Sequence, residues 1–65
     1  MEKIRIKELR EEKGLSQSQL AKAIGIKQQA ISNYELGIRE PDIQTIKMLC
    51  KFFDVTAGYL LGMED

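Results

Sequence analysis

The side chains of this 65-residue sequence are suited to hydrogen-bond recognition rather than to bond-breaking chemistry. Histidine, the commonest general base and a frequent metal ligand, does not occur, and the single cysteine, Cys50, can form neither an internal disulfide nor a metal-ligand set. The five glycines do not follow the spacing of a phosphate-binding loop. We therefore expect no enzyme, no metal site and no cofactor, and no small-molecule ligand is evident.

A dense group of hydrogen-bonding side chains occupies residues 27–33. Its members are Lys27, Gln28, Gln29, Ser32 and Asn33. A side-chain amide presents a donor and an acceptor together, and this pair matches N6 and N7 of adenine in the major groove of DNA. A helix face that is merely solvated more often carries pairs of Glu and Lys. The group therefore favours contact with DNA bases over an exposed face without a ligand.

The charges are divided unevenly along a chain whose net charge is zero. Residues 1–39 carry eight basic and five acidic side chains, a net charge of +3, whereas residues 40–65 carry two basic and five acidic ones, a net charge of −3. This polarity suits a module that presents one face to phosphates. Ordinary scatter over a highly charged surface is the alternative, so the asymmetry supports other signals without standing alone.

Length and hydrophobicity indicate one small soluble domain over residues 1–65. A chain of this size forms one domain, and 43% hydrophobic residues can supply a compact core. Its apolar runs are too short for a signal peptide or a membrane span. We expect a cytoplasmic protein that does not bind a membrane.

Hydrophobic periodicity and helix-end signals divide the chain into five helices without a strand, so the expected fold class is all-α. The expected helices cover about residues 3–13, 17–24, 28–35, 42–53 and 57–61. Ser16 and Gln19 have the spacing of a capping box, Asp42 and Thr56 are suited to cap the last two helices, and Gly25 ends the second. The apolar stripe expected on the fourth helix consists of Ile43, Ile46, Leu49, Cys50 and Phe53.

The second and third expected helices form a tight corner. Residues 25–27 are too few to let these helices lie antiparallel, so they must cross steeply, as in a helix-turn-helix. Ala21 lies where the helices would touch, and Ile31 and Tyr34 face the core. This arrangement leaves the polar side chains of residues 27–33 facing outward.

The sequence resembles the phage-repressor or Cro-like helix-turn-helix proteins, also called the Xre family, over essentially its whole length. The matching motifs are Ile6-Lys7-Glu8-Leu9-Arg10, Leu15-Ser16-Gln17-Ser18-Gln19-Leu20-Ala21, Gly25-Ile26, Ala30-Ile31-Ser32-Asn33-Tyr34-Glu35, Pro41-Asp42 and Tyr59-Leu60-Leu61-Gly62. The resemblance implies a compact five-helix domain whose third helix enters the DNA major groove. It also implies a bacterial or phage transcriptional regulator, for which we favour a repressor, acting as a homodimer on a double-stranded operator with an inverted repeat. Whether the chain is part of a longer regulator stays open.

The resemblance also implies which residues contact bases. Gln28 and Gln29 are the leading base contacts, followed by Ser32 and Asn33. Lys27 stands where the family usually has a Ser or Thr that caps the third helix, and lysine cannot accept that hydrogen bond. Either Lys27 reaches a phosphate or a guanine, or the substitution is neutral drift.

Phosphate contacts and a structural ion pair follow from the same resemblance. Gln17 begins the second helix, where its backbone N–H can bind a phosphate, and in the family its side chain braces the residue at position 28. Arg39 is expected to contact a phosphate, and Ser16 is either a helix cap or also a phosphate contact. Arg10 and Glu35 are expected to form a partly buried ion pair, with Arg10 also touching a phosphate.

A modest apolar group near the end of the chain could serve a dimer contact. It consists of Phe52, Tyr59, Leu60 and Met63. Packing against the fifth helix explains these residues equally well. Two other functions also stay open, namely an antitoxin-like or adaptor module that holds a partner protein, and a structural dimerisation domain. The amide-rich face favours DNA binding, because partner-binding surfaces are enriched in aromatic residues.

Overall fold

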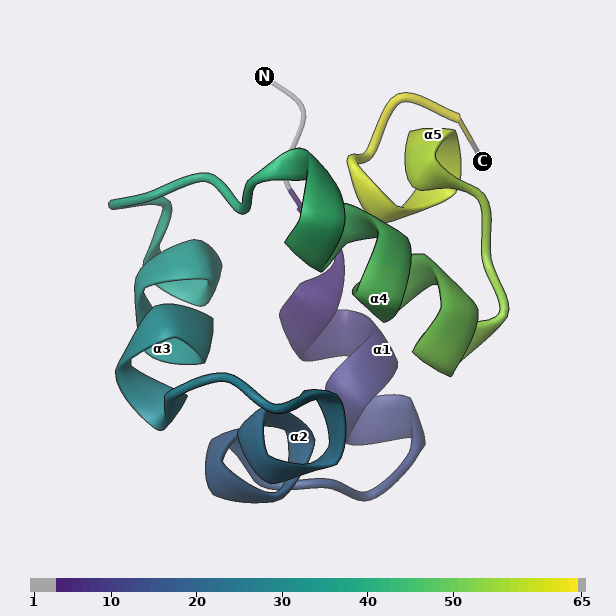
Figure 1. The fold of residues 1–65 in the computed structure, drawn as a ribbon. Helices are drawn as coiled ribbons and strands as arrows, with labels where there is room; N and C mark the ends of the chain where they lie inside the picture. Colours follow the sequence, from purple (N-terminus) through teal and green to yellow (C-terminus); the bar gives the residue numbers. More distant parts are fainter. Residues whose placement is uncertain (1–3, 65) are drawn as a thin grey trace.

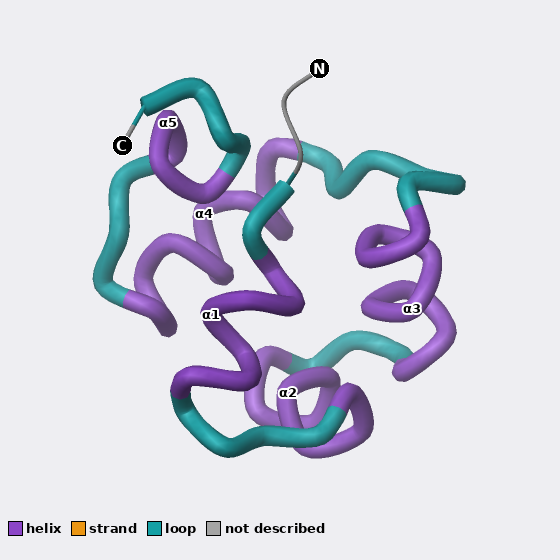
Figure 2. Tube along the Cα trace, turned by 180° about the vertical axis from the view of Figure 1, so that it is seen from behind, coloured by secondary structure: helices purple, strands orange, loops and turns teal. Residues whose placement is uncertain are grey.

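The computed structural model describes residues 4–64 and contains five helices in this range, with no strand. The helices are α1 (Ile6–Glu12), α2 (Gln17–Ile24), α3 (Gln28–Leu36), α4 (Ile43–Phe53) and α5 (Ala57–Leu60). Figures 1 and 2 show α3 and α5 on opposite sides of the molecule, with α1 and α4 between them. The all-α fold and the helix order confirm the expectation from the sequence. None of these helices is long and apolar enough to cross a membrane.

The first helix is shorter than expected. The predicted start at residue 3 lies outside the described residues, and α1 begins only at Ile6, after Ile4 and Arg5. The reason is a tertiary contact: the backbone N–H of Arg5 donates to the carbonyl of Leu60 at 2.8 Å and ties this segment to α5. The other four helices begin and end within about one residue of the predicted ranges.

Side-chain caps fix three helix starts as predicted. At α2, Ser16 Oγ accepts from the Gln19 N–H at 3.0 Å while Gln19 Oε1 accepts from the Ser16 N–H at 2.8 Å. At α4, Asp42 Oδ1 accepts from the Thr45 N–H at 2.8 Å. At α5, Thr56 Oγ1 accepts from the Tyr59 N–H at 3.1 Å. Each cap satisfies backbone donors that would otherwise lack a partner, so each defines where its helix begins.

Each helix contributes one fully buried aliphatic side chain to a single core. These side chains are Ile6, Leu20, Ile31, Leu49 and Leu60. Tyr34 and Phe53 add buried rings, and Cys50 is half-buried beside them, where burial raises the pKa of its thiol. Cys50 therefore behaves as a small apolar side chain, as the sequence suggested.

Two apolar residues differ from the prediction in whether their side chains are buried or exposed. Leu60 is fully buried, so its prediction as a dimer contact is wrong; α5 is a short helix that needs this side chain to anchor it to the core. Ile43 is 73% exposed, so its place in the buried stripe of α4 is also wrong. At 3.6 residues per turn, Ile43 lies roughly 120° around the helix from Leu49, at the edge of the stripe.

Candidate nucleic-acid interface

The corner between α2 and α3 has the geometry that the sequence predicted. Figure 1 shows α2 almost along its axis, whereas α3 runs upward in the plane of the view, so the two helices cross steeply. Gly25 ends α2 with a φ of +78°, a left-handed conformation that glycine adopts without penalty. The carbonyl of Ala21 accepts from the N–H groups of both Gly25 and Ile26 at 2.9 Å. The Ala21 side chain is buried, which lets the two helices approach.

One face of α3 packs on the core and the other carries the polar group. Ile31 and Tyr34 are buried, whereas Lys27, Gln28 and Gln29 are exposed and Ser32 and Asn33 are half-buried. The list of predicted base contacts therefore falls on one accessible surface. Gln29 Nε2 donates to Asn33 Oδ1 at 3.1 Å, so these two side chains hold each other in position along the helix.

The start of α3 lacks a side-chain cap. Lys27 is the N-cap residue, in an extended conformation, and its side chain makes no capping hydrogen bond. The first N–H groups of α3 consequently point out of the helix without a side-chain partner. A helix start of this kind attracts anionic groups, and the N-cap residue Lys27 carries a positive charge of its own.

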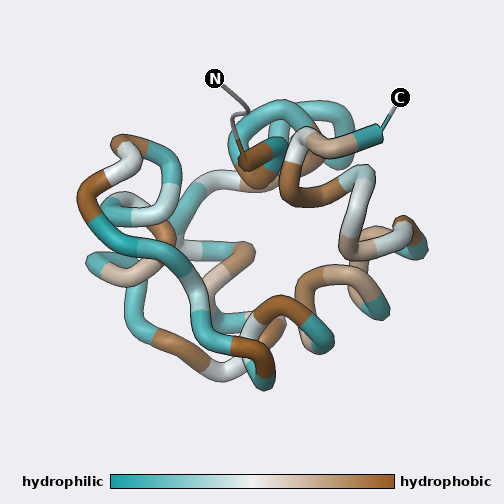
Figure 3. Tube along the Cα trace, turned by 90° about the horizontal axis from the view of Figure 1, so that it is seen from above, coloured by the Kyte–Doolittle hydropathy of each residue, from teal (hydrophilic) through white to brown (hydrophobic). Residues whose placement is uncertain are grey.

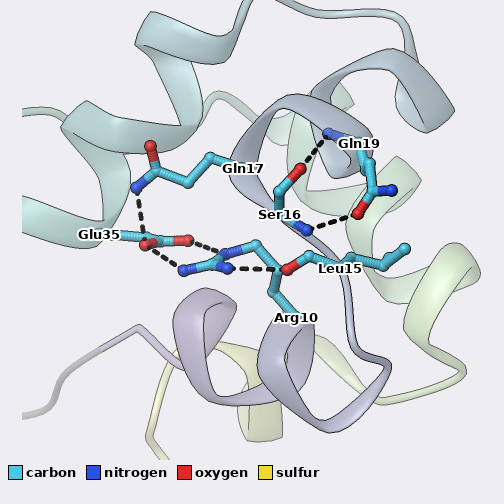
Figure 4. A network of polar contacts seen from close by, with 6 residues as sticks. All are labelled: Arg10, Leu15, Ser16, Gln17, Gln19 and Glu35. Carbon is cyan, nitrogen blue, oxygen red and sulfur yellow. Dashed lines mark hydrogen bonds and ion pairs between the residues drawn. The ribbon is translucent and has the colours of Figure 1, made fainter.

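Arg10 and Glu35 form the ion pair that the family resemblance implies (Figure 4). Arg10 Nε donates to Glu35 Oε2 at 2.7 Å and Nη2 donates to Oε1 at 3.0 Å. Nη1 donates to the Leu15 carbonyl at 2.8 Å. The side chains of Arg10 and Glu35 are only 11% and 5% exposed. The pair therefore joins the end of α1 to the end of α3 in a largely dry setting.

Gln17 joins the same carboxylate instead of bracing Gln28. Its Nε2 donates to Glu35 Oε1 at 3.0 Å, while Gln28 stays exposed (Figure 4). The expected brace to Gln28 is therefore absent, because the ionised carboxylate is a stronger acceptor than a neutral amide. One carboxylate thus connects α1, α2 and α3.

The network keeps both members of the ion pair charged. Burial alone would raise the pKa of Glu35, but the hydrogen bonds from Arg10 and Gln17 and the charges of Arg10 and Lys7 outweigh it, so this pKa is lowered. The hydrogen bond to Glu35 raises the pKa of Arg10. All three guanidinium nitrogens of Arg10 are used within the protein. This leaves little of Arg10 for the phosphate contact expected of it.

The remaining predicted site residues differ in their exposure and in their contacts with the rest of the protein. Arg39 is exposed in the loop after α3, and Ser16 is exposed although its hydroxyl already caps α2. Phe52 packs edge-on against Phe53 at 5.2 Å, and Tyr59 lies 4.2 Å beneath the Arg5 guanidinium. These contacts favour the packing explanation for both rings over a dimer contact. Met63 stays 70% exposed.

Sequence reasoning missed two features at this end of the molecule. It did not place Gln17 on Glu35, since their contact spans 18 residues and depends on how α2 and α3 cross. It also overlooked Leu36 and Ile38, which follow residues 27–33 and are 70% and 69% exposed. The signal for these two was their position beyond Tyr34, the last core residue of α3, on either side of Gly37.

Comparison with known proteins identifies the family. A family model described as helix-turn-helix matches residues 6–60, which is most of the chain. The chain belongs to the Xre or Cro-like helix-turn-helix family. This confirms the resemblance that its motifs indicated.

Several curated relatives are similar over nearly the whole chain. The HTH-type transcriptional regulator ImmR of Bacillus subtilis (strain 168) is 36% identical over 61 residues, which cover 94% of this chain and 48% of that protein. The HTH-type transcriptional activator BcrR of Enterococcus faecalis is 38% identical, over 94% of this chain and 30% of its own. The cryptic phage CTXphi transcriptional repressor RstR of Vibrio cholerae is 33% identical, over 94% and 55%. The chain spans about half the length of ImmR and less than two thirds of the length of each of these relatives.

Proposed function

We propose that this chain binds double-stranded DNA sequence-specifically and regulates transcription, as a repressor, with α3 in the major groove. The observation that carries the proposal is the exposed amide surface of α3, held on a scaffold by the carboxylate of Glu35. Family membership and relatives named as transcriptional regulators support it, and one of these relatives is named a repressor. A repressor would act by occupying the operator, where its bulk excludes other proteins. Because the ligand is genomic DNA, we place the protein in the cytoplasm of a bacterium.

The proposed base contacts follow from the positions on α3. Gln28 and Gln29 lie in its first turn, the part of a recognition helix that contacts base edges, with Ser32 and Asn33 one turn further along. The bond from Gln29 to Asn33 leaves Gln29 Oε1 and the Asn33 amide nitrogen available to a base. Each well-placed amide would discriminate between bases by about 1–3 kcal/mol. Lys27, at the uncapped start of α3, would reach a phosphate or a guanine.

The proposed phosphate contacts are Gln17, Arg39 and Ser16. Gln17 would act through its backbone N–H, at the positive end of α2, because its side-chain amide already binds Glu35. Arg39 would hold the backbone without reading sequence. Arg10 is left out of this set, since its guanidinium is used to orient Glu35.

We further propose that two copies bind one operator as a homodimer. Two recognition helices can enter the major groove on one side of the duplex only if their half-sites lie about one helical turn, ~10 base pairs, apart. The preferred site would then be an inverted repeat with that spacing.

Selection from a pool of random-sequence duplexes tests this function. We expect an enriched inverted repeat, and we expect affinity for it to fall steeply as salt rises, because phosphate contacts release counterions. An unenriched pool, together with an affinity that does not change with salt, would contradict DNA recognition. It would favour the alternative function of an adaptor that holds a partner protein.

A further inference from the structure

A hydrogen bond on the polar face of α3 joins two of the proposed base contacts. Gln29 Nε2 donates to Asn33 Oδ1 at 3.1 Å. Residues four apart on a helix are neighbours, and the side chain of the later residue leans back toward the earlier one. Figure 3 shows hydrophilic and hydrophobic stretches alternating along the chain, as expected of helices that bury only one face. The bond from Gln29 to Asn33 lies on the outward face of α3.

Asn33 is the more firmly placed of the two residues. It is half-buried, whereas Gln29 is exposed. The backbone carbonyl of Asn33 accepts from the N–H of Ile38 at 3.0 Å and from the N–H of Arg39 at 3.3 Å, in the turn that ends α3. Asn33 therefore offers a well-placed acceptor, to which the longer side chain of Gln29 is tied.

The direction of this bond decides which atoms remain for DNA. Asn33 uses its amide oxygen within the protein and keeps an amide nitrogen with two N–H donors. Gln29 uses one of its N–H donors and keeps both the other N–H and the oxygen Oε1. Two side-chain amides that are chemically alike thus present different hydrogen-bonding groups.

We propose that this bond divides base recognition, so that Gln29 contacts adenine and Asn33 contacts guanine. The inference rests on the proposed DNA-binding function and names the bases at two positions of the preferred site. In the major groove adenine presents the acceptor N7 beside the donor N6, which match the groups left to Gln29. Guanine presents two acceptors, N7 and O6, which match the two donors left to Asn33. An unrestrained asparagine would instead prefer adenine.

Binding in the major groove would strengthen the bond. In water, a hydrogen bond between side chains four residues apart contributes little to stability. In the groove the local dielectric constant is lower, so each hydrogen bond is electrostatically stronger. Breaking the bond there would leave polar atoms without partners, which is unfavourable. Adenine opposite Asn33 would require its amide to turn and break the bond, whereas guanine would not.

Site selection from random-sequence duplexes, repeated with folded variants, tests this division. Asn33→Ala identifies the base position that Asn33 contacts, because it abolishes the preference there; in wild type we expect guanine. Gln29→Leu removes the donor that holds Asn33 Oδ1, so the same position should change from guanine to adenine. Gln28→Ala is the matched control, because it removes a neighbouring amide that takes no part in the bond. It should leave guanine in place.

Asn33→Asp separates holding Gln29 from contacting a base. Its carboxylate can still accept from Gln29 Nε2 but has no donor for guanine, so adenine opposite Gln29 should persist. Guanine should be replaced by cytosine, whose N4 donates to a carboxylate. In Asn33→Ala the Gln29 amide must be ordered on binding, so its preference for adenine should fall by roughly two- to tenfold.

The outcomes separate this inference from the proposed function. A base other than guanine opposite Asn33 in wild type, or an unchanged preference in Asn33→Ala, would overturn the inference and leave DNA recognition intact. Guanine that persists in Gln29→Leu, or that is lost in Gln28→Ala, would also overturn it, because guanine would then not depend on this bond. Failure of wild type to enrich any sequence would instead overturn the proposed function, and this inference with it.

Discussion

Arg10 and Glu35, which are 25 residues apart in sequence, meet through two parallel hydrogen bonds, Nε to Oε2 at 2.7 Å and Nη2 to Oε1 at 3.0 Å. A two-point contact of this kind fixes orientation as well as distance. It therefore sets the angle at which the end of α3 stands on α1.

Removing either partner of the pair should destabilise the fold strongly. Arg10→Ala or Glu35→Ala leaves a largely buried charge without its partner, for which we expect a loss of about 3 kcal/mol in the free energy of unfolding. Urea unfolding of both single variants and the double variant gives the coupling energy. It should exceed the ~0.2–1 kcal/mol of exposed pairs, and strictly additive losses would show that the pair contributes nothing in solution.

Stability should fall in acid through Glu35. Its pKa is lower in the folded protein than in the unfolded chain, so the unfolded chain binds the proton first as pH falls. The stabilisation is present above the unfolded pKa, about 4.3, and is lost as pH falls through the folded value. Glu35→Gln should flatten the pH dependence of the urea midpoint in this window.

Asp42 supplies the control for that measurement. Hydrogen bonds from the backbone and side chain of Thr45 lower the pKa of Asp42, so it acts in the same acid range. Asp42→Asn keeps a good helix cap and removes the contribution of Asp42 to the pH dependence of stability. The contribution of Glu35 stays intact. An identical pH profile for wild type and Glu35→Gln would contradict the role of Glu35.

A cap introduced at α3 should stabilise the protein. Lys27 has the extended conformation of an N-cap but makes no capping hydrogen bond, so Lys27→Ser should raise the free energy of unfolding by about 1 kcal/mol. If Lys27 also reaches a phosphate, the same variant should bind DNA more weakly with a smaller salt slope. Ser16→Ala, which removes an existing cap, should show the opposite change in stability.

Base contact and phosphate contact should give different losses. Gln28→Ala should weaken the preferred site by about 1–3 kcal/mol and flatten preference at one base position, with little effect on non-specific binding. Arg39→Ala should weaken binding to all sequences and lower the salt slope by about one unit. Both side chains are exposed, so melting should be unchanged. An unaltered base preference in folded Gln28→Ala would remove this residue from the proposed contacts.

The sequence predicted the features of the fold that depend on neighbouring residues. The caps at Ser16, Asp42 and Thr56 form between residues three apart, so type and spacing were sufficient. Gly25 acts through its own backbone. The buried face of α3 followed from periodicity, because Ile31 and Tyr34 lie three residues apart.

Features that depend on how helices pack were not predicted from these local patterns. The start of α1 depends on a hydrogen bond to Leu60, far along the chain. Whether Leu60 and Ile43 are buried depends on which other elements cover them. Periodicity alone does not show that no element covers a residue at the edge of an apolar stripe. The Arg10–Glu35 pair came from family resemblance, whereas the contact of Gln17 with Glu35 required the structure.

The side chains that hold α3 in place are not those proposed to contact DNA. Ile31, Tyr34 and Glu35 fasten α3 to the core and to its neighbours. Gln28 and Gln29 are exposed, and neither takes part in the hydrogen bonds around Glu35. If Gln28 and Gln29 contact bases as proposed, substitutions there should change the preferred operator while folding stability is retained. Such a division would let one scaffold carry different side chains at these positions and bind different operators within one cell. It also makes α3 a starting point for engineered specificities.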